Sequence, residues 1–371
     1  MKTPRVAIDV RYAEGPLSGF GRFTWTLIEG LVETGPPEPL LLVRRPAQTI
    51  PEALILAPGL RWRIVDRAPY EPLGQWRLAR DLRGEGIRVM VSPDCFAPLG
   101  SRLKQVITVH DIIPLRCPEL LPRSAKGRFF RLWRQWLRLQ IAGADRVLTV
   151  SEHARSDIAG MFPGTFEKVR TVYNAVPRPE PQSQCRPASG LGLGPAKLLY
   201  VGRDAPYKNI VGCVETVAAL RRMGIDANLT IVGAPDPRYP EVGKAIARFQ
   251  LEDRVSVTGH VDEATLIRLY REASIFLFLS RYEGFGLPPL EAMAQGVPVI
   301  SSSSASLPEV LGDAAILVDP DNSEAAAHAV RRILESPDLA RDLAERGYMR
   351  AALFTTRRQA TMFWEAIAPL L

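Results

Sequence analysis

Two glutamates eight positions apart are the side chains whose spacing first suggests chemistry. Glu283 and Glu291 enclose the run EGFGLPPLE, a glycine- and proline-rich turn. A strand expected over Ala273–Ser280 and a helix expected over Leu290–Gln295 would direct backbone N–H groups and a helix N-terminus toward an anion. Carboxylates beside a phosphate suit hydroxyl groups on either side of it. A sugar nucleotide has that arrangement of ribose, diphosphate and sugar.

Two cations follow a second predicted strand, Lys197–Gly202, in the run GRDAPYKN. Arg203 and Lys208 would then lie at the carboxyl end of that strand. A guanidinium and an ammonium there can hold a diphosphate and stabilise the charge that grows on it as it leaves. The alternative is a surface loop with two solvated cations.

The N-terminal half offers two further candidates. His110, followed by Asp111, ends a strand expected over Val106–Val109, where it can meet a substrate hydroxyl or, alternatively, lie satisfied in the core. The loop Ser18–Arg22 places Gly19, Phe20 and Gly21 where a helix begins, and its small residues allow a phosphate to approach the backbone.

The elements that must position these residues alternate between strand and helix along the whole chain. At 371 residues the chain is expected to form two domains, each with a parallel sheet and covering helices. We expect an N-terminal domain over 1–177, a linker over 178–195, a C-terminal domain over 196–351, and a last helix, 352–371, that packs back on the first domain. Expected strands start with Val6–Val10, Leu40–Val43, Val89–Val91, Val106–Val109 and Val147–Val150, and continue with Lys197–Gly202, Asn228–Val232, Val255–Thr258, Ile275–Leu279, Val297–Ile300 and Ala315–Val318. In such sheets ligands bind at the carboxyl ends of the strands.

Composition narrows the class of protein. No apolar run is long enough to span a bilayer, a strand follows the N-terminus too closely for a signal peptide, and the four cysteines have no paired spacing, which argues against zinc or disulfides. A cytoplasmic protein is expected. Residues 1–176 hold 26 Lys and Arg against 17 Asp and Glu, a net charge of +9, whereas the remainder holds 21 against 23. The basic half suggests an anionic partner, with membrane phosphates and nucleic acid both as candidates, or reflects solvated arginines. In the final interpretation of the sequence, given below, a nucleic-acid partner is not expected.

Two other segments have competing interpretations. The basic aromatic run 128–138 is helical in pattern, with Phe129, Leu132, Trp133 and Trp136 on one face. We expect that face to pack into the first domain, although it could also lie at a membrane interface. Asp319-Pro-Asp321 has the D-x-D form of some metal sites, but its position before a predicted helix favours a turn.

Taken in order, these motifs resemble a known family. TVHDIIPL, VLTVSEHARSDI, VYNAV, YVGRDAPYKN, VTGHV and SRYEGFGLPPLEAMAQGVPVISS, with the glycine loop at 18–21, are similar to the retaining group 4 glycosyltransferases of GT-B fold. That family includes mannosyltransferases of bacterial polysaccharide assembly. The resemblance covers nearly the whole chain and implies two Rossmann-like domains facing a cleft. One departure is the SGFG loop, where many members have a Gly-Gly pair.

The resemblance also implies roles. Glu283 would contact the donor sugar, Glu291 the ribose, and Arg203 with Lys208 the diphosphate. The remaining assignments are His110 near the donor sugar, Gly19, Phe20 and Gly21 at the β-phosphate and acceptor side, Val261 at the base, and the backbone of Phe285, Gly286 and Leu287 at the phosphates.

The expected activity is transfer of a sugar from a nucleotide diphosphate, with retention of anomeric configuration and with no metal or other cofactor. GDP-mannose is the expected donor and a glycan or lipid-linked oligosaccharide the acceptor, at the inner face of the plasma membrane; a UDP-sugar is the alternative donor. An acceptor hydroxyl can pass its proton to the leaving phosphate, whereas a double displacement would need Glu283 as nucleophile. A non-catalytic sugar-binding subunit also competes. A nicotinamide-dependent oxidoreductase is disfavoured because Gly19 and Gly21 lack a third glycine and lie well past the first strand.

Overall fold

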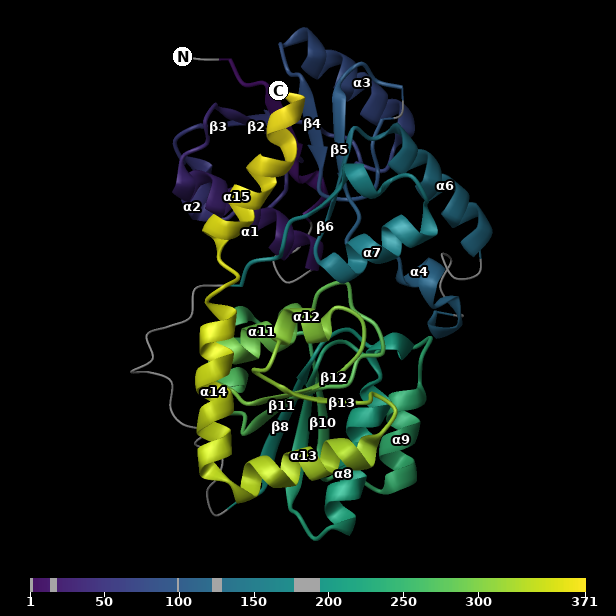
Figure 1. Ribbon diagram of the computed structural model, residues 1–371, viewed down its shortest axis with the longest axis vertical. Helices are drawn as coiled ribbons and strands as arrows, with labels where there is room; N and C mark the ends of the chain where they lie inside the picture. Colours follow the sequence, from purple (N-terminus) through teal and green to yellow (C-terminus); the bar gives the residue numbers. More distant parts are fainter. Residues whose placement is uncertain (1–2, 14–18, 99, 122–128, 177–193) are drawn as a thin grey trace. The chain divides into compact units, whose positions relative to one another are not determined.

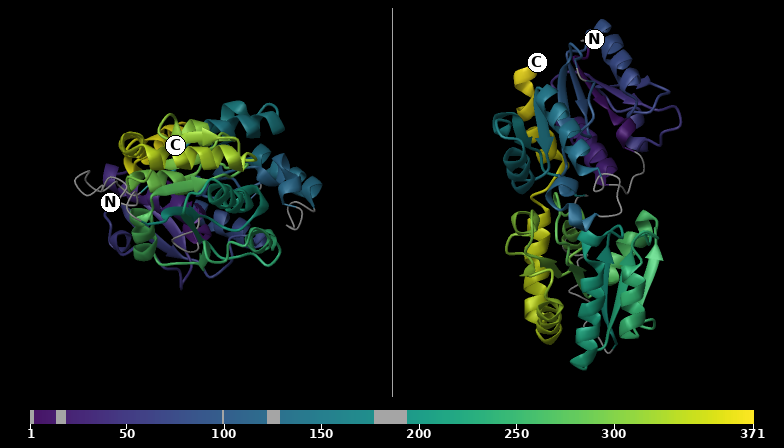
Figure 2. Two further views of the ribbon diagram at one scale, coloured as in Figure 1. Left: turned by 90° about the horizontal axis from the view of Figure 1, so that it is seen from below. Right: turned by 90° about the vertical axis from the view of Figure 1, so that its right-hand side faces the viewer.

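The computed structural model describes residues 3–13, 19–98, 100–121, 129–176 and 194–371, and the chain forms two compact units (Figure 1). The first unit comprises Met1–Ile112, Phe129–Ala175 and Phe354–Leu371; the second comprises Ile113–Arg128 and Val176–Leu353. Each unit has one parallel sheet with helices on both sides of the strands (Figure 2). The α/β architecture of two Rossmann-like domains predicted from the sequence is confirmed.

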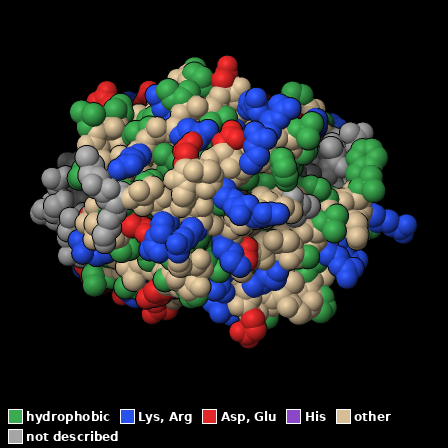
Figure 3. All heavy atoms as spheres, turned by 90° about the horizontal axis from the view of Figure 1, so that it is seen from above, with side chains coloured by type: hydrophobic (Ala, Val, Ile, Leu, Met, Phe, Trp, Pro, Cys, Tyr) green, Lys and Arg blue, Asp and Glu red, His purple; other side chains and the backbone are tan. Residues whose placement is uncertain are grey.

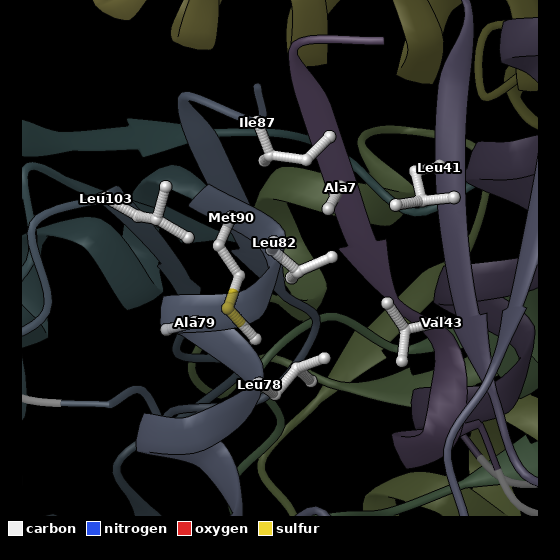
Figure 4. Close-up of a cluster of buried hydrophobic side chains, with 9 residues drawn as sticks. All are labelled: Ala7, Leu41, Val43, Leu78, Ala79, Leu82, Ile87, Met90 and Leu103. Carbon is white, nitrogen blue, oxygen red and sulfur yellow. The ribbon is translucent and has the colours of Figure 1, made fainter. Parts of the chain in front are cut away.

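The sheet of the first unit has seven strands in the order β3-β2-β1-β4-β5-β6-β7. Their bounds are β1 Val6–Asp9, β2 Leu40–Arg44, β3 Leu60–Ile64, β4 Val89–Ser92, β5 Lys104–Thr108, β6 Arg146–Thr149 and β7 Val169–Thr171. The central strands are apolar at nearly every position because helices cover both faces. Figure 4 shows one resulting core cluster, in which Ala7 and Met90 meet Leu78 and Leu82 of the helix α3 (Pro72–Gly84).

Two strands of this sheet were not predicted. β3 carries Arg61 and Arg63 and is largely accessible, because it forms one edge of the sheet. β7 has three residues and forms the other edge. Edge strands bury little surface, so their residues lack the apolar pattern that identified the central strands.

The last helix of the chain packs in the first unit. α15 (Thr356–Ile367) lies against α1 (Gly19–Thr34), and Thr26 Oγ1 donates to Gln359 Oε1 at 2.8 Å. The helices touch at Gly30, where a Cβ atom would come within 2.0 Å of the Thr356 carbonyl oxygen. The other helices of this unit are α2 Glu52–Ile55, α6 Phe130–Gly143 and α7 Glu152–Met161.

The sheet of the second unit has six strands in the order β10-β9-β8-β11-β12-β13. Their bounds are β8 Ala196–Val201, β9 Ala227–Val232, β10 Val255–Gly259, β11 Ile275–Phe278, β12 Val299–Ser302 and β13 Ile316–Val318. The helices are α4 Ile113–Arg116, α8 Ile210–Arg222, α9 Glu241–Phe249, α10 Glu263–Glu272, α11 Leu287–Ala294, α12 Leu307–Leu311, α13 Ser323–Glu335 and α14 Pro337–Ala351. β8 and β11 are neighbours at the centre, so the loops that follow them leave the same edge side by side.

One segment groups differently from the sequence expectation. Residues 113–121, the described part of Ile113–Arg128, belong to the second unit rather than the first. Ile113 and Leu121 join a cluster with Tyr207 and Tyr282, which come from the loops after β8 and β11. Of the expected linker, 178–195, the structure describes only the last two residues.

The basic aromatic helix α6 corrects another prediction. Trp133 and Trp136 are half-buried and stacked with ring centroids 4.6 Å apart, whereas Phe129 and Leu132 are exposed. The prediction that this whole face packs into the first domain was therefore wrong. The buried residues of α6 are Leu137, Gln140 and Ile141 instead.

Lys and Arg side chains are spread over the face of the molecule that Figure 3 shows. No helix among the described residues combines the length and apolar character needed to cross a membrane.

Candidate active site

The site in the second unit is built where two neighbouring strands end. The loop after β8 carries Arg203 and Lys208, and the loop after β11 carries Glu283. Parallel pairing of these strands brings both loops to one edge of the sheet. The predicted convergence of Lys208 and Glu283 is therefore present.

Lys208 and Glu283 form an ion pair in which the ammonium contacts both carboxylate oxygens. Lys208 Nζ donates to Glu283 Oε1 at 2.7 Å and to Oε2 at 2.9 Å, and the two side chains are 13% and 10% exposed. The ammonium also lies 5.3 Å from the ring centre of Tyr207 and 5.5 Å from that of Phe278. Most of each side chain is shielded from water, but a small part of each remains accessible to solvent.

The balance of forces on Lys208 keeps it charged. Burial favours the neutral amine, but attraction by Glu283 and by Tyr207 outweighs it, so that the pKa of Lys208 is raised. Arg203 is close enough to oppose this effect slightly, and its Nη2 lies 3.4 Å from the Tyr207 hydroxyl. Tyr207 thus connects the exposed guanidinium to the sheltered ammonium, which places two positive charges at one loop.

Ser306 supports the turn that follows Glu283. Ser306 Oγ lies 2.9 Å from each of the carbonyl oxygens of Glu283 and Phe285 and is fully buried. Gly286 then adopts φ +111°, and a Cβ atom there would come 2.7 Å from Leu307. Glycine is required at this position for both reasons. The turn leads directly into α11, whose first residue is Leu287.

The start of α11 limits which amides can meet an anion. Pro288 and Pro289 occupy the first turn and have no N–H group, which leaves those of Gly286 and Leu287 at the helix N-terminus. Both residues belong to the predicted phosphate-binding backbone. The helix begins at Leu287, three residues earlier than predicted, because proline fits the first helical turn.

Glu291 lies inside α11 and has a different partner from Glu283. Its Oε2 accepts a hydrogen bond of 2.9 Å from the Tyr270 hydroxyl of α10, and the residue is buried. Val261 lies between β10 and α10, which starts after the capping residue Asp262. Val261 thus follows the carboxyl end of β10, and Glu291 is hydrogen-bonded to the helix that comes next, α10.

The first unit holds the other predicted residues. Gly19, Phe20 and Gly21 open α1 instead of forming a loop, and the residues before them lie outside the described part of the chain. His110 follows β5 and is flanked edge-on by Phe20 and Phe23, with ring centroids 4.7 and 4.9 Å away.

The protonation of His110 follows from its surroundings. Its Nε2 lies 2.9 Å from the Pro93 carbonyl oxygen, which can only accept, so Nε2 carries the proton. Burial lowers the pKa of His110, although Pro93, Asp94 and Asp111 oppose this. The ring is therefore neutral at pH 7, and Nδ1 is an acceptor.

Sequence reasoning missed three residues of the site. Tyr207 lies within the GRDAPYKN run, and its position beside Lys208 was the available signal. Tyr270 had none, because a tyrosine among the apolar residues of a helix such as α10 resembles any core residue. Ser306 lies in a serine-rich run whose members look alike in sequence.

The D-x-D run forms a turn, as predicted. Asp321 pairs with Arg281 at 2.7 Å, and Asn322 caps α13 by accepting from the Ala325 amide. Among the described residues no group of three or more His, Cys, Asp and Glu side chains could hold a metal ion.

Comparison with known proteins shows the family of the chain. Residues 17–178 match the family described as Glycosyltransferase Family 4, and residues 182–350 match Glycosyl transferases group 1. Over 365 residues the chain is 29% identical to the O-antigen chain mannosyltransferase B of Escherichia coli, covering 92% of this chain and 93% of that protein.

Solved structures agree on the fold. Sucrose-phosphate synthase from Thermosynechococcus elongatus superposes with a TM-score of 0.74 at 21% identity, covering 100% of this chain and 99% of that one. HepE of Anabaena, solved with UDP and glucose, gives 0.73 at 18% identity over 98% and 99% of the two chains. The two family matches follow one another along nearly the whole chain, and the chain belongs to the group 1, family 4 glycosyltransferases of GT-B fold.

Proposed function

We propose that this glycosyltransferase moves mannose from GDP-mannose onto a glycan or lipid-linked oligosaccharide, with retention of anomeric configuration. The observation that carries the proposal is the Lys208–Glu283 pair at the carboxyl edge of the second sheet. It unites a phosphate-binding cation with a hydroxyl-binding carboxylate in one sheltered place. The mannose donor is supported by the Escherichia coli relative, which is a mannosyltransferase by name.

In this proposal, Lys208 and Glu283 exchange each other for groups of the donor when the donor binds. In the structure, Lys208 and Glu283 neutralise each other. In the proposed complex, the ammonium turns to the diphosphate and the carboxylate accepts hydrogen bonds from sugar hydroxyls. The ammonium then keeps a counter-charge and the carboxylate keeps hydrogen-bond donors, which limits the cost of burying either ion. In the same proposal, Arg203 contacts the diphosphate, Glu291 the ribose and Val261 the base. The backbone amides of Phe285, Gly286 and Leu287 meet the phosphates.

The chemical step needs no protein base in this proposal. The acceptor oxygen bonds to the anomeric carbon on the face from which the diphosphate leaves, and the acceptor proton passes to a phosphate oxygen. Lys208 and Arg203 stabilise the charge on the leaving diphosphate, so no metal is required. Transfer is expected to continue after chelation of divalent cations. The neutral His110 offers Nδ1 as an acceptor for a donor-sugar hydroxyl, and Gly19, Phe20 and Gly21 open the helix proposed to meet the β-phosphate.

A UDP-sugar is the second candidate donor, favoured by the UDP and glucose bound in the HepE structure. A panel of GDP- and UDP-sugars distinguishes the two, because a ligand that binds only the folded state raises the melting temperature. Turnover with the stabilising donor supports an enzyme. Stabilisation without transfer to any glycan or lipid-linked acceptor would instead support a sugar-binding subunit.

The roles are tested with a matched pair of variants. Lys208→Ala or Glu283→Ala is expected to abolish turnover, whereas Lys197→Ala or Glu272→Ala removes one partner of an exposed pair, 3.8 Å apart, in the same unit. Near-normal turnover of either Lys208 or Glu283 variant would contradict the proposal. The anomeric configuration of the product, determined by NMR, tests retention. A lipid-linked acceptor would place the reaction at the cytoplasmic face of a membrane.

A further inference from the structure

Helix α6 is fixed firmly at its C-terminal half. Leu137 and Ile141 are buried, and Gln140 Oε1 accepts from the Ala97 amide at 2.9 Å. Lys168 Nζ donates to the carbonyl oxygens of Ile141, Ala142 and Ala144 at 2.9 to 3.1 Å, which closes the end of the helix. These contacts hold the remainder of α6 in a defined orientation.

The opposite side of the same helix presents apolar side chains to solvent. Phe129, Leu132 and Leu139 are spaced three and seven residues apart, so they form one stripe, and they are 59%, 71% and 50% exposed. Phe130 is exposed as well. Leaving several large apolar side chains in water is unfavourable, and a contiguous group of them marks an interaction surface.

A basic stripe runs beside the apolar one. Arg131, Arg134 and Arg138 are spaced three and four residues apart, which also places them on one side of the helix, and they are exposed. Within the described part of the chain, no carboxylate forms an ion pair with any of these three arginines. The sequence has no Asp or Glu between Glu119 and Asp145. The charge on this side of α6 is therefore uncompensated.

An aromatic row extends the surface beyond α6. Trp133 stacks on Trp136, Trp136 stacks on Phe96 at 5.7 Å, and Phe96 meets Tyr70 at 6.1 Å. Tyr70 is exposed. Rings with an apolar body and a polar edge are favoured where hydrocarbon meets headgroups.

We propose that this aromatic-basic surface docks the first unit on an anionic lipid bilayer. The surface consists of Tyr70, Phe96, Phe129, Phe130, Leu132, Trp133, Trp136 and Leu139 with Arg131, Arg134 and Arg138. The apolar stripe enters the boundary between headgroups and acyl chains, and the arginines meet lipid phosphates. Adjacent apolar and unpaired basic stripes favour this occupant, because a second copy would bring the same three positive charges against the first. The proposed lipid-linked acceptor would give this docking a biological purpose, but bilayer binding itself does not depend on that acceptor.

The test is flotation of the full chain with vesicles of phosphatidylcholine alone or of equal parts phosphatidylcholine and phosphatidylglycerol. Binding is expected for the anionic vesicles and should weaken with added salt. Arg131→Gln/Arg134→Gln/Arg138→Gln should weaken partitioning roughly fivefold for each arginine removed. Leu132→Ser/Leu139→Ser should weaken it on both kinds of vesicle.

Matched controls remove the same groups elsewhere. Arg248→Gln/Arg268→Gln/Arg332→Gln changes the net charge equally on exposed positions of the second unit, and Leu56→Ser alters another exposed leucine. The controls should float like the unaltered chain. Absence of flotation at low salt, equal loss in the controls, or full binding by the α6 variants would overturn the proposal. Light scattering could instead show a dimer of the unaltered chain that is lost in Leu132→Ser/Leu139→Ser. If no vesicle binding were seen as well, the surface would bind a second copy of the chain and not a bilayer.

The vesicle result can be separated from the proposed reaction. Sugar transfer to a water-soluble acceptor should be unchanged in the α6 variants, because none of these residues is assigned to the donor site. Loss of flotation with intact transfer supports the docking surface. Flotation without any transfer would leave the surface standing and contradict the proposed function.

Discussion

The two units each contain a buried ion pair at the carboxyl end of their sheet, and the pairs are enclosed to different degrees. In the first unit Arg11 contacts Asp9 through Nε at 2.8 Å and Nη2 at 2.6 Å, and both side chains are fully buried. Nη1 of Arg11 donates to the Arg67 carbonyl oxygen at 3.0 Å, and Nη2 donates also to Gln75 Oε1 at 3.1 Å. Every side of this pair is occupied by protein.

The Lys208–Glu283 pair of the second unit is built differently. Lys208 has aromatic rings beside it, and both side chains retain a small exposed fraction. A saturated pair can contribute only to the folded structure, whereas a pair that solvent can reach can exchange partners with a ligand. The difference separates a structural ion pair from one suited to binding.

The largest expected effect tests the exchangeable pair. Lys208→Met should reduce turnover by about a hundredfold to a thousandfold, because a preorganised charge aimed at the leaving group is lost. Lys208→Met/Glu283→Gln should be no more active than Lys208→Met but more stable, since no charge is left unpaired. Steady-state kinetics and thermal unfolding measure the two effects. If the double variant regained turnover, the pair would be structural, like Asp9–Arg11.

The saturated pair should give the opposite result. Arg11→Met leaves Asp9 buried without its partner and should lower the unfolding free energy by about 3–5 kcal/mol. All 6 tryptophans of the chain lie in the first unit, so the urea dependence of tryptophan fluorescence reports on that unit alone. At temperatures where the variant is folded, its turnover should remain near normal. A selective loss of turnover would assign Arg11 to the reaction.

A smaller effect is expected behind the Glu283 turn. Ser306→Ala removes the hydroxyl shared by the Glu283 and Phe285 carbonyl oxygens and leaves both buried without it. We expect a loss of about 1–3 kcal/mol in stability and roughly tenfold in turnover, because the turn is less rigidly held. Ser303→Ala, at an exposed position in the same serine run, is the control. Equal effects in the two variants would show that Ser306 does not position the turn.

The smallest effect is a pH dependence of the first unit. Because the pKa of His110 is lowered from 6.5 in the folded state, the unfolded state binds its proton first as the pH falls. The stability contributed by the neutral ring is present above 6.5 and decreases as the pH falls below it. His110→Gln should flatten this decrease in the tryptophan fluorescence transition. An unchanged pH profile would contradict the lowered pKa of His110.

The site was predictable to different extents in its parts. Glu283, Arg203 and Lys208 could be identified because each follows a short, mainly apolar strand, and the ends of such strands are visible in sequence. That Lys208 and Glu283 bond each other could not, since it depends on β8 and β11 being adjacent although 75 residues separate the pair. Segment 113–121 was misplaced for the same reason: chain order does not reveal packing partners.

The amino-acid sequence by itself determined the two parallel-sheet units, their central strands and the turn at Gly286, because hydrophobic periodicity and backbone restrictions act over a few neighbouring residues. The tertiary structure alone decided that Ser306 supports that turn and Tyr270 bonds Glu291. It also decided which side of α6 is covered. Burial depends on which distant segments come together, and a helix with apolar residues around most of its circumference does not specify which of its stripes the rest of the chain will cover.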